Sequence, residues 1–478
     1  MVHLGPKPPQ HRKGSFLDVP EYLLKELTEL EGLLTVSGET LRKITDHFIS
    51  ELEKGLSKQG GNIPMIPGWV MDFPTGKEMG DYLAIDLGGT NLRVVLVKLG
   101  GNRDFDTTQS KFALPENMRT AKSEELWEFI AECLQKFVEE EFRNGVLSNL
   151  PLGFTFSYPA SQGSINEGYL QRWTKGFDIE GVEGHDVVPM LQAAIEKRKV
   201  PIEVVALIND TTGTLVASMY TDPEAKMGLF SGTGCNGAYY DVVDNIPKLE
   251  GKVPDDIKSS SPMAINCEYG AFDNEHIILP RTKYDIQIDE ESPRPGQQAF
   301  EKMISGYYLG EVLRLILLDL TSKQLIFKDQ DLSKLQVPFI LDTSIPARIE
   351  EDPFENLSDV QELFQEILGI QTTSPERKII RRLAELIGER SARLSICGIA
   401  AICKKRGYKT AHCAADGSVY NKYPGFKERA AKGLRDIFQW ESEEDPIVIV
   451  PAEDGLGAGA AIIAALTEKR LKDGLPLV

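Results

Sequence analysis

The first apolar residues of the chain recur every three or four positions, which predicts two amphipathic helices near the N-terminus. Their apolar faces hold Leu23, Leu27, Leu30 and Leu34 in the first helix and Leu41, Ile44, Phe48 and Leu52 in the second. Asp18 and Ser37 are the candidate N-caps, because a short polar side chain can accept hydrogen bonds from the free N–H groups of a first helical turn. Gly60 and Gly61 are expected to end the second helix.

Further along, the pattern changes to short apolar runs between turn residues, which is typical of buried strands. Two runs, at 82–85 and 94–97, flank a Gly-Gly turn and predict a β-hairpin. Apolar residues alternate again from 152 to 156. Helical patterns lie between the strands, around 124–142 and 186–198. This alternation of strands and helices predicts an α/β fold class.

The second half of the chain repeats this scheme. Further strands are predicted at 204–208, 229–230 and 447–450. The last of them is followed by three alternating glycines and by a helix that is expected to run from 460 to 471. Two segments rich in Pro, Asp and Ser, 244–262 and 341–360, are predicted to be loops. Two halves of this kind predict a duplicated architecture with a cleft between them.

Length and charge narrow the class of protein. A chain of 478 residues is long enough for about two large domains. Its net charge of −19 disfavours nucleic acid and anionic lipid as partners. No apolar run approaches the roughly 18–20 residues that span a bilayer, and the six cysteines contain no Cys-x-x-Cys pair. We therefore expect a cytoplasmic protein with reduced thiols and no membrane partner.

The N-terminal residues 1–16 lack periodic apolar positions and are predicted to be disordered. Within them, Ser15 follows the basic pair Arg12 and Lys13 at a spacing that suits a basic-directed kinase. An unmodified solvated tail is the alternative.

The turn at 86–93 is a candidate phosphate site. Gly88 and Gly89 remove side chains from a tight turn, so backbone N–H groups can approach phosphate oxygens. Thr90 and Asn91 add neutral donors, and Asp86 is placed to hold Mg²⁺ through water. A plain Gly-Gly hairpin is the alternative. The chain has no Walker motif, which needs Gly-x-x-x-x-Gly-Lys-Ser/Thr.

A candidate general base lies at the end of the strand predicted at 204–208. Asp210 would be held rigidly there and partly desolvated, which favours proton acceptance. An Asx-turn is the alternative role for such an aspartate. A hexose would also need several polar groups converging on its hydroxyls. The candidates at loop starts are Ser157, Thr174, Lys175, Asn209, Asn236, Glu268 and Glu301.

Eight segments carry a combined signal through their residues and their order: 86–93 (DLGGTNLR), 153–159 (GFTFSYP), 173–177 (WTKGF), 208–211 (INDT), 232–236 (GTGCN), 266–270 (NCEYG), 415–420 (ADGSVY) and 455–461 (GLGAGAA). In these segments the sequence resembles a known family, the hexokinases of the actin/Hsp70/sugar-kinase superfamily, and within it the single-unit fungal kind. The resemblance covers about residues 20–470 and implies a two-lobed actin-like ATPase fold of the ribonuclease H-like type.

The resemblance also implies domain boundaries. The expected parts are a disordered tail at 1–16, a helical part of the large domain at 17–75, a small domain at 76–208, a large domain at 209–457 and a C-terminal helix at 458–478 that returns to the small domain. The two domains would close around the sugar and expel water that would otherwise compete as the acceptor.

Activity and residue roles follow from the same resemblance. The implied reaction is transfer of the γ-phosphoryl group of Mg-ATP to the 6-hydroxyl of glucose, fructose or mannose, the first step of glycolysis, with Asp210 as general base and Lys175 as a second catalytic residue. The implied hexose ligands are Ser157, Thr174, Lys175, Asn209, Asp210, Asn236, Glu268 and Glu301. The implied ATP ligands are Asp86, Gly88, Gly89, Thr90, Asn91, Arg93, Lys111, Thr211, Thr233, Asp416, Gly417 and Ser418. Asp86 would hold Mg²⁺ through water, and a homodimer in equilibrium with the monomer is expected.

Three other classes of protein share parts of this pattern. The glycines at 455–459 superficially resemble a dinucleotide loop, but the chain is too short beyond them for the next strand and its ribose-binding acid. A chaperone or filament ATPase would lack the sugar segments. A sugar sensor that has this fold without catalysis stays open, although every catalytic group is present.

Overall fold

The structure is a computed structural model, and it describes residues 16–88, 90–143, 145, 149–173, 177–255 and 257–475. Six of the positions singled out above lie outside the described residues, namely Arg12, Lys13, Ser15, Gly89, Thr174 and Lys175, as does the tail predicted to be disordered up to residue 15. None of the helices within the described ranges is long and apolar enough to cross a membrane.

A five-stranded sheet forms the core of one half of the molecule, here called the small lobe, in the order β4-β3-β2-β5-β8. The strands are β2 (Met79–Leu87), β3 (Asn91–Gly101), β4 (Asp104–Ala113), β5 (Leu150–Thr155) and β8 (Ile202–Ile208). β2, β3 and β4 are antiparallel, whereas β2, β5 and β8 run parallel. Side chains of β2 alternate between two buried layers, because Leu83 and Ile85 pack in one apolar cluster and Tyr82 and Ala84 in the other.

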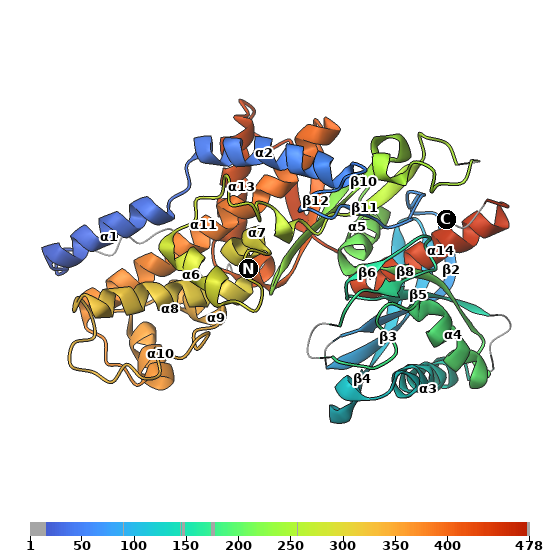
Figure 1. Cartoon of the computed structure of the whole chain (residues 1–478), viewed down its shortest axis with the longest axis horizontal. Helices are drawn as coiled ribbons and strands as arrows, with labels where there is room; N and C mark the ends of the chain where they lie inside the picture. The colour runs from blue at the N-terminus through green and yellow to red at the C-terminus, as the bar shows by residue number, and fades with distance from the viewer. Residues whose placement is uncertain are drawn as a thin grey trace, which may run out of the picture.

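Helices cover both faces of this sheet (Figure 1). They are α3 (Ser123–Glu141) and α4 (Val187–Lys197) on one side and α14 (Ala460–Lys472) on the other. Short elements complete this half: β6 (Ala160–Ser161), β7 (Tyr169–Leu170) and the 3₁₀ helix η1 (Glu116–Thr120). The hairpin, the strand at 152–156 and the helices at 124–142 and 186–198 are therefore confirmed to within a few residues.

The other half, here called the large lobe, holds a six-stranded sheet in the order β1-β11-β10-β9-β12-β13. Its strands are β1 (Ile66–Pro67), β9 (Ala225–Ser231), β10 (Cys235–Val242), β11 (Pro262–Asn266), β12 (Ala411–Asp416) and β13 (Ile447–Pro451). β9, β10 and β11 are antiparallel, and β9, β12 and β13 run parallel. This is the arrangement of the five-stranded sheet repeated, so the predicted duplication is confirmed.

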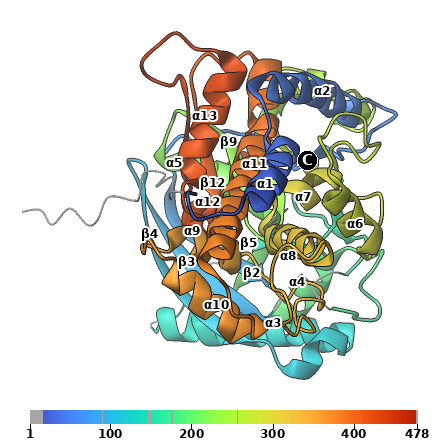
Figure 2. The ribbon, with the colours of Figure 1, turned by 90° about the vertical axis from the view of Figure 1, so that its left-hand side faces the viewer.

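The large lobe is mostly helical outside its sheet. Its longer helices are α1 (Glu21–Leu34), α2 (Gly38–Leu56), α5 (Asp210–Thr221), α6 (Lys283–Glu291), α8 (Gly306–Ser322), α9 (Ser344–Glu351), α10 (Ser358–Leu368), α11 (Ser374–Arg406) and α13 (Phe426–Phe438). The short ones are α7 (Ala299–Ile304), α12 (Ser418–Lys422), η2 (Val243–Asn245), η3 (Pro247–Leu249) and η4 (Tyr269–Ala271). Figure 2 shows α1, α8, α9 and α13 arranged around the 33-residue helix α11.

Two expectations for this lobe are wrong. Asp18 does not cap α1; its carboxylate accepts hydrogen bonds from Ser374 Oγ at 2.9 Å and from Lys378, which ties the chain before α1 to the start of α11. The segment 341–360 is not a loop, because α9 forms within it and buries Ile345 and Ile349, four residues apart, on one face. The predicted cap of α2 is confirmed, since Ser37 Oγ accepts from the N–H of Thr40 at 3.1 Å.

The lobes meet where α5 crosses the turn of π-helix η5 (Gly455–Gly459) that leads into α14. The backbones approach so closely that a Cβ built on Gly459 would lie 2.2 Å from the carbonyl oxygen of Gly213. Only glycine fits such a crossing. Because α5 begins directly after β8, this contact fixes how the end of β8 faces the large lobe.

Candidate active site

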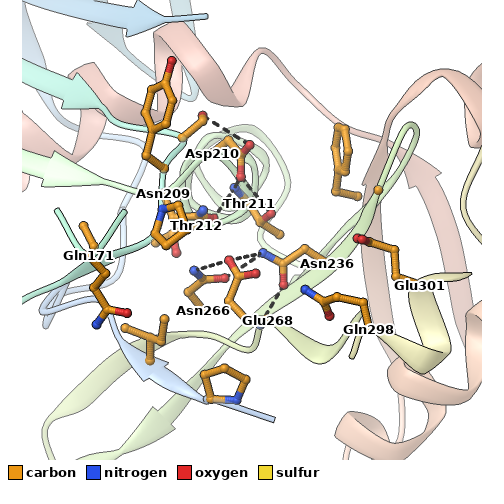
Figure 3. Close-up of a pocket in the computed structure, with 18 of the residues that line it drawn as sticks. Gln171, Asn209, Asp210, Thr211, Thr212, Asn236, Asn266, Glu268, Gln298 and Glu301 are labelled. Atoms are coloured by element: carbon orange, nitrogen blue, oxygen red, sulfur yellow. Dashed lines mark hydrogen bonds between the residues drawn. The ribbon is translucent and has the colours of Figure 1, made fainter. Parts of the chain in front are cut away.

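A cleft of about 1040 Å³ lies between the lobes, at the end of β8 (Figure 3). Seven of the predicted site residues line it: Ser157, Asn209, Asp210, Thr211, Asn236, Glu268 and Glu301. The first four come from the ends of β5 and β8 and the start of α5, and the other three from β10, the segment after β11 and α7. The structure thus brings together residues that are up to 144 positions apart in the chain.

Asp210 lies at the first residue of α5, where the chain leaves β8. Asn209 caps this helix, because its Oδ1 accepts from the N–H of Thr211 at 2.8 Å. One carboxylate oxygen of Asp210 accepts from the N–H of Thr211 at 2.7 Å and from its hydroxyl at 3.1 Å. Among the described residues, the other accepts from Ser157 Oγ alone, at the longer distance of 3.3 Å. The helix N-terminus favours a negative charge here, and the second oxygen is the one available to a ligand.

The wall opposite Asp210 is a connected hydrogen-bond network around Asn236 (Figure 3). Its Oδ1 accepts from the backbone N–H of Glu268 at 2.9 Å and of Gly237 at 2.7 Å. Its Nδ2 donates to Asn266 Oδ1 at 2.8 Å and to Glu268 Oε1 at 3.1 Å. With every donor and acceptor of the amide engaged, Asn236 holds the Glu268 carboxylate in one orientation. Asn266 was not selected from the sequence, although it stands in the segment that suggested Glu268.

Glu301 and Gln298 form the third side of the cleft. Glu301 accepts from the N–H of Cys235 at 3.0 Å. Gln298 has left-handed backbone, with φ of 57°, and its buried Oε1 has no hydrogen-bond partner within the described part of the chain. Glu268 also has left-handed backbone, with φ of 56°. Non-glycine residues in this backbone conformation cost about 1–3 kcal/mol each and cluster at functional sites. Sequence patterns carried no signal for Gln298.

The carboxylates of the cleft affect one another's protonation. The pKa of Glu268 is raised from 4.5 to about 7, chiefly by burial. The charges of Asp210 and Glu301 act in the same direction, against hydrogen bonds from Asn266 and Asn236. Burial likewise raises the pKa of Glu301. Burial, with the nearby charges of Glu301 and Glu268, raises the pKa of the Cys235 thiol, which favours its neutral form.

We expect Glu268→Gln to stabilise the free protein above pH 7. In the folded state the carboxyl keeps its proton up to about pH 7, whereas in the unfolded chain it ionises near 4.5. Stability is therefore lost as the pH rises from 4.5 to 7, and the full loss, up to about 3 kcal/mol, persists above pH 7. The isosteric amide removes it. Urea unfolding at pH 4.5 and pH 8 measures the effect: a gain at pH 8 that vanishes at pH 4.5 is expected, and an equal change at both values contradicts it.

The predicted phosphate residues of the small lobe cluster at the same edge of its sheet as Asp210. The ladder pairs Asp86 with Thr155 and Thr155 with Ile208, so the end of β2 lies two strands, or roughly 10 Å, from the end of β8. The turn is closed by hydrogen bonds from Gly88 N–H to Asn91 C=O at 3.0 Å and from Leu114 N–H to the C=O of Thr90 at 2.9 Å. The phosphate turn and the candidate base therefore belong to one edge.

Two basic residues lie next to this turn. Arg93 and Lys111 occupy the same rung of β3 and β4. The Arg93 guanidinium donates to Gln109 Oε1 at 2.5 Å and forms an ion pair with Asp454 at the start of η5. Arg93 thus joins the small-lobe sheet to the segment where the lobes meet, whereas Lys111 is exposed.

The large-lobe phosphate and nucleoside candidates form a second group. The N–H of Gly417 donates to its neighbour's carboxylate, Asp416 Oδ1, at 2.6 Å. Gly417 has φ of 109°, and a Cβ there would lie 2.3 Å from the carbonyl oxygen of Ser231, beside the loop that carries Thr233. The carbonyl of Thr233 accepts from the N–H of Tyr307 at 3.4 Å. Thr233 and Ser418 are exposed. Of the predicted ATP ligands that the structure describes, Thr211 alone lines the cleft of about 1040 Å³.

Within the described ranges, no group of three or more His, Cys, Asp or Glu side chains could hold a metal ion. The six cysteines are free and buried.

Comparison with known proteins identifies the family. Two family models, both described as hexokinase, match residues 26–220 and 226–466. The chain belongs to the hexokinase family. It is 76% identical to hexokinase-2 of Candida albicans, over 99% of this chain and 98% of that protein, and 71% identical to hexokinase-1 of Saccharomyces cerevisiae, over 100% and 99%.

A solved structure of another hexokinase is also similar. The structure of the hexokinase from Schistosoma mansoni complexed with glucose aligns with a TM-score of 0.81 at 33% identity and covers 93% of this chain and 99% of that one. The two-lobed sugar-kinase fold implied by the sequence motifs is therefore confirmed for this hexokinase.

Proposed function

We propose that this chain transfers the γ-phosphoryl group of Mg-ATP to the 6-hydroxyl of a hexose and so catalyses the first step of glycolysis. The observation that carries the proposal is the position of Asp210: its less engaged carboxylate oxygen faces a cleft whose opposite wall is the fixed network of Asn236 and Glu268. Such a cleft can hold one polyhydroxylated ligand and accept one proton from it.

The hexose would be bound by polar side chains from both lobes of the cleft. Ser157 and Asn209 would contact it from the small-lobe side, and Glu268 and Glu301 from the large lobe. Asn236 would exchange its 3.1 Å hydrogen bond to Glu268 for one to a sugar hydroxyl. Thr174 and Lys175 are proposed as further ligands, with Lys175 also placing charge near the transferred phosphoryl group. Asp210 accepts the hydroxyl proton as the oxygen attacks phosphorus, and the ADP oxygen takes up the developing charge.

The phosphates of Mg-ATP are proposed to bind between the two groups of donors. On the small-lobe side these are Asp86, Gly88, Gly89, Thr90, Asn91, Arg93 and Lys111, and on the large-lobe side Thr211, Thr233, Asp416, Gly417 and Ser418. Asp86 would hold the Mg²⁺ of the substrate through water, which suits an ion that keeps most of its hydration shell. Because these groups lie on both lobes, phosphoryl transfer requires the small domain, 76–208, and the large domain, 209–457, to close around the hexose, with 458–478 as the returning helix.

A coupled assay tests the proposal. The purified full chain is supplied with Mg-ATP and, separately, with glucose, fructose or mannose, and both ADP and hexose 6-phosphate are measured. Turnover with at least one hexose is expected. Sugar binding by calorimetry without any turnover would replace the enzyme by a sugar sensor.

The same preparation, examined by sedimentation, tests the proposed equilibrium between monomer and homodimer. A cytoplasmic location is part of the proposal, and no direct membrane or nucleic-acid partner is expected.

We expect Lys111→Met to raise the KM for ATP about fivefold without changing kcat. An exposed ion pair contributes up to about 1 kcal/mol, which corresponds to roughly that factor. Lys98→Met is the matched control, since Lys98 is an equally exposed lysine further along β3, away from the turn. Equal KM values for the two variants would remove Lys111 from the nucleotide site.

A further inference from the structure

The segment 292–298, between α6 and α7, supplies much of one wall of the cleft. The residues of it that line the cleft are Ser292, Pro293, Arg294, Gln297 and Gln298. The segment contains no regular helix or strand. Its last residue, Gln298, has left-handed backbone and a buried amide oxygen without a partner in the described structure. Something other than local backbone regularity must therefore hold this segment in place.

A buried ion pair at the margin of the cleft does so, and one of its partners, Lys302, also lines the cleft. Asp289 on α6 and Lys302 on α7 are 6% and 5% exposed, and their charged groups are 2.6 Å apart. The Lys302 ammonium also donates to the carbonyl of Arg294 at 2.8 Å, and the Asp289 carboxylate accepts from the N–H of Gly296 at 3.1 Å. Both partners of the pair thus bind the backbone of the cleft segment directly, at its middle.

The pair also sets the start of α7. The N–H of Lys302 donates to the carbonyl of Gln298 at 2.9 Å, in the first turn of the helix. Glu301, the preceding residue, lines the cleft and accepts from Cys235 N–H. Two neighbouring residues of one short helix therefore have separate tasks: Glu301 faces the ligand, and Lys302 ties the helix to α6.

Asp289 has two further basic neighbours. Arg281 donates to its Oδ2 at 3.1 Å, and His276 Nε2 lies 3.8 Å from the same atom. Burial would raise the pKa of Asp289, but Lys302, the N–H of Gly296 and Arg281 outweigh it and lower the pKa below its usual value. These neighbours therefore favour the ionised form of Asp289. A buried ion pair contributes little net stability compared with apolar packing, so positional control is the better account of its presence.

We propose that the Asp289–Lys302 pair is a positioning device for the hexose: it holds the segment 292–298 and the start of α7 so that Gln298 and Glu301 face the sugar, without itself taking part in phosphoryl transfer. This inference rests on the proposed hexokinase activity. It makes both residues determinants of hexose affinity rather than of chemistry or of ATP binding.

Steady-state kinetics of Lys302→Met test it. We expect the KM for glucose to rise about tenfold or more, since the ammonium's hydrogen bond to the carbonyl of Arg294 and its ion pair with Asp289 are both lost, while kcat at saturating sugar and the KM for ATP stay within about threefold. Lys302→Arg, which can still pair with Asp289, should recover part of the glucose affinity. Glu350→Gln is the matched control, because it breaks the equally buried Glu350–Arg429 pair of the large lobe and should lower stability without changing the KM for glucose.

A double variant separates positioning from folding. Lys302→Met leaves Asp289 buried without its lysine, so the Lys302→Met/Asp289→Leu chain is measured beside it. Removing both charges relieves the cost of the unpaired anion, but the hydrogen bonds to Arg294 and Gly296 are lost. A raised KM for glucose in the folded double variant supports the proposal, and a wild-type KM overturns it. If the wild-type chain phosphorylates no hexose, the proposed function fails. If the wild type is active and the double variant has a wild-type KM for glucose, the positioning proposal alone fails.

Discussion

We expect Asp210→Asn to lower kcat by about 10²–10⁴-fold while leaving hexose binding nearly intact. The amide has the same shape and can keep its hydrogen bonds to Thr211 through one oxygen. It cannot accept a proton from the attacking hydroxyl, so the loss falls on the transition state and not on the bound ground state. Initial rates with saturating glucose and Mg-ATP measure the first effect, and calorimetric titration with glucose measures the second.

Asp222→Asn is the matched control for this variant. Asp222 follows the last residue of α5, at the opposite end of the helix that Asp210 begins, and its carboxylate contacts His412. The same chemical change there is expected to leave kcat unaltered. A wild-type rate for Asp210→Asn would exclude it as the general base, and a loss of glucose binding as large as the loss of rate would make it a sugar ligand only.

The fold and the cleft-lining residues in short motifs could be predicted, because local sequence patterns encode them. Strand ends, a glycine turn and a helix start are each a few residues long, and Asp210 and Glu268 stand in such segments. The ladder then places these ends at one sheet edge, which follows from parallel pairing of β2, β5 and β8. Segment order along the chain was enough to indicate the family and, through it, the two-lobed fold.

What supports the site could not be predicted, because it depends on contacts between distant or irregular parts of the chain. Asp289 and Lys302 are ordinary charged residues in the sequence. Their ion pair forms because folding buries them side by side, which no local pattern indicates. The ion pair of Arg93 with Asp454, 361 residues away, likewise carries no signal in the sequence. The segment 341–360 was misread because Pro, Asp and Ser are also frequent around short helices, and α9 forms there by packing on α8 and α11.

We expect Gly459→Ala to destabilise the protein by about 3 kcal/mol or more and to lower kcat by about tenfold or more. The new methyl group would lie 2.2, 2.5 and 2.6 Å from the O, C and Cα atoms of Gly213. No side chain can rotate away from this clash, since every atom involved is backbone, so α5 has to move relative to η5. Asp210 is the first residue of α5, and a shift of about 1 Å in a catalytic group can cost up to 10²-fold in rate.

Gly32→Ala is the control for this substitution. Gly32 lies within α1, and a Cβ there would have no neighbour within 4 Å. Alanine should stabilise that helix by about 0.5–1 kcal/mol and leave turnover unchanged. Urea unfolding and initial rates of both variants separate two roles of the crossing. If Gly459→Ala unfolds more easily but keeps the full rate, the crossing supports the fold alone; if it loses rate as well, the close contact of α5 with η5 also sets the position of the base.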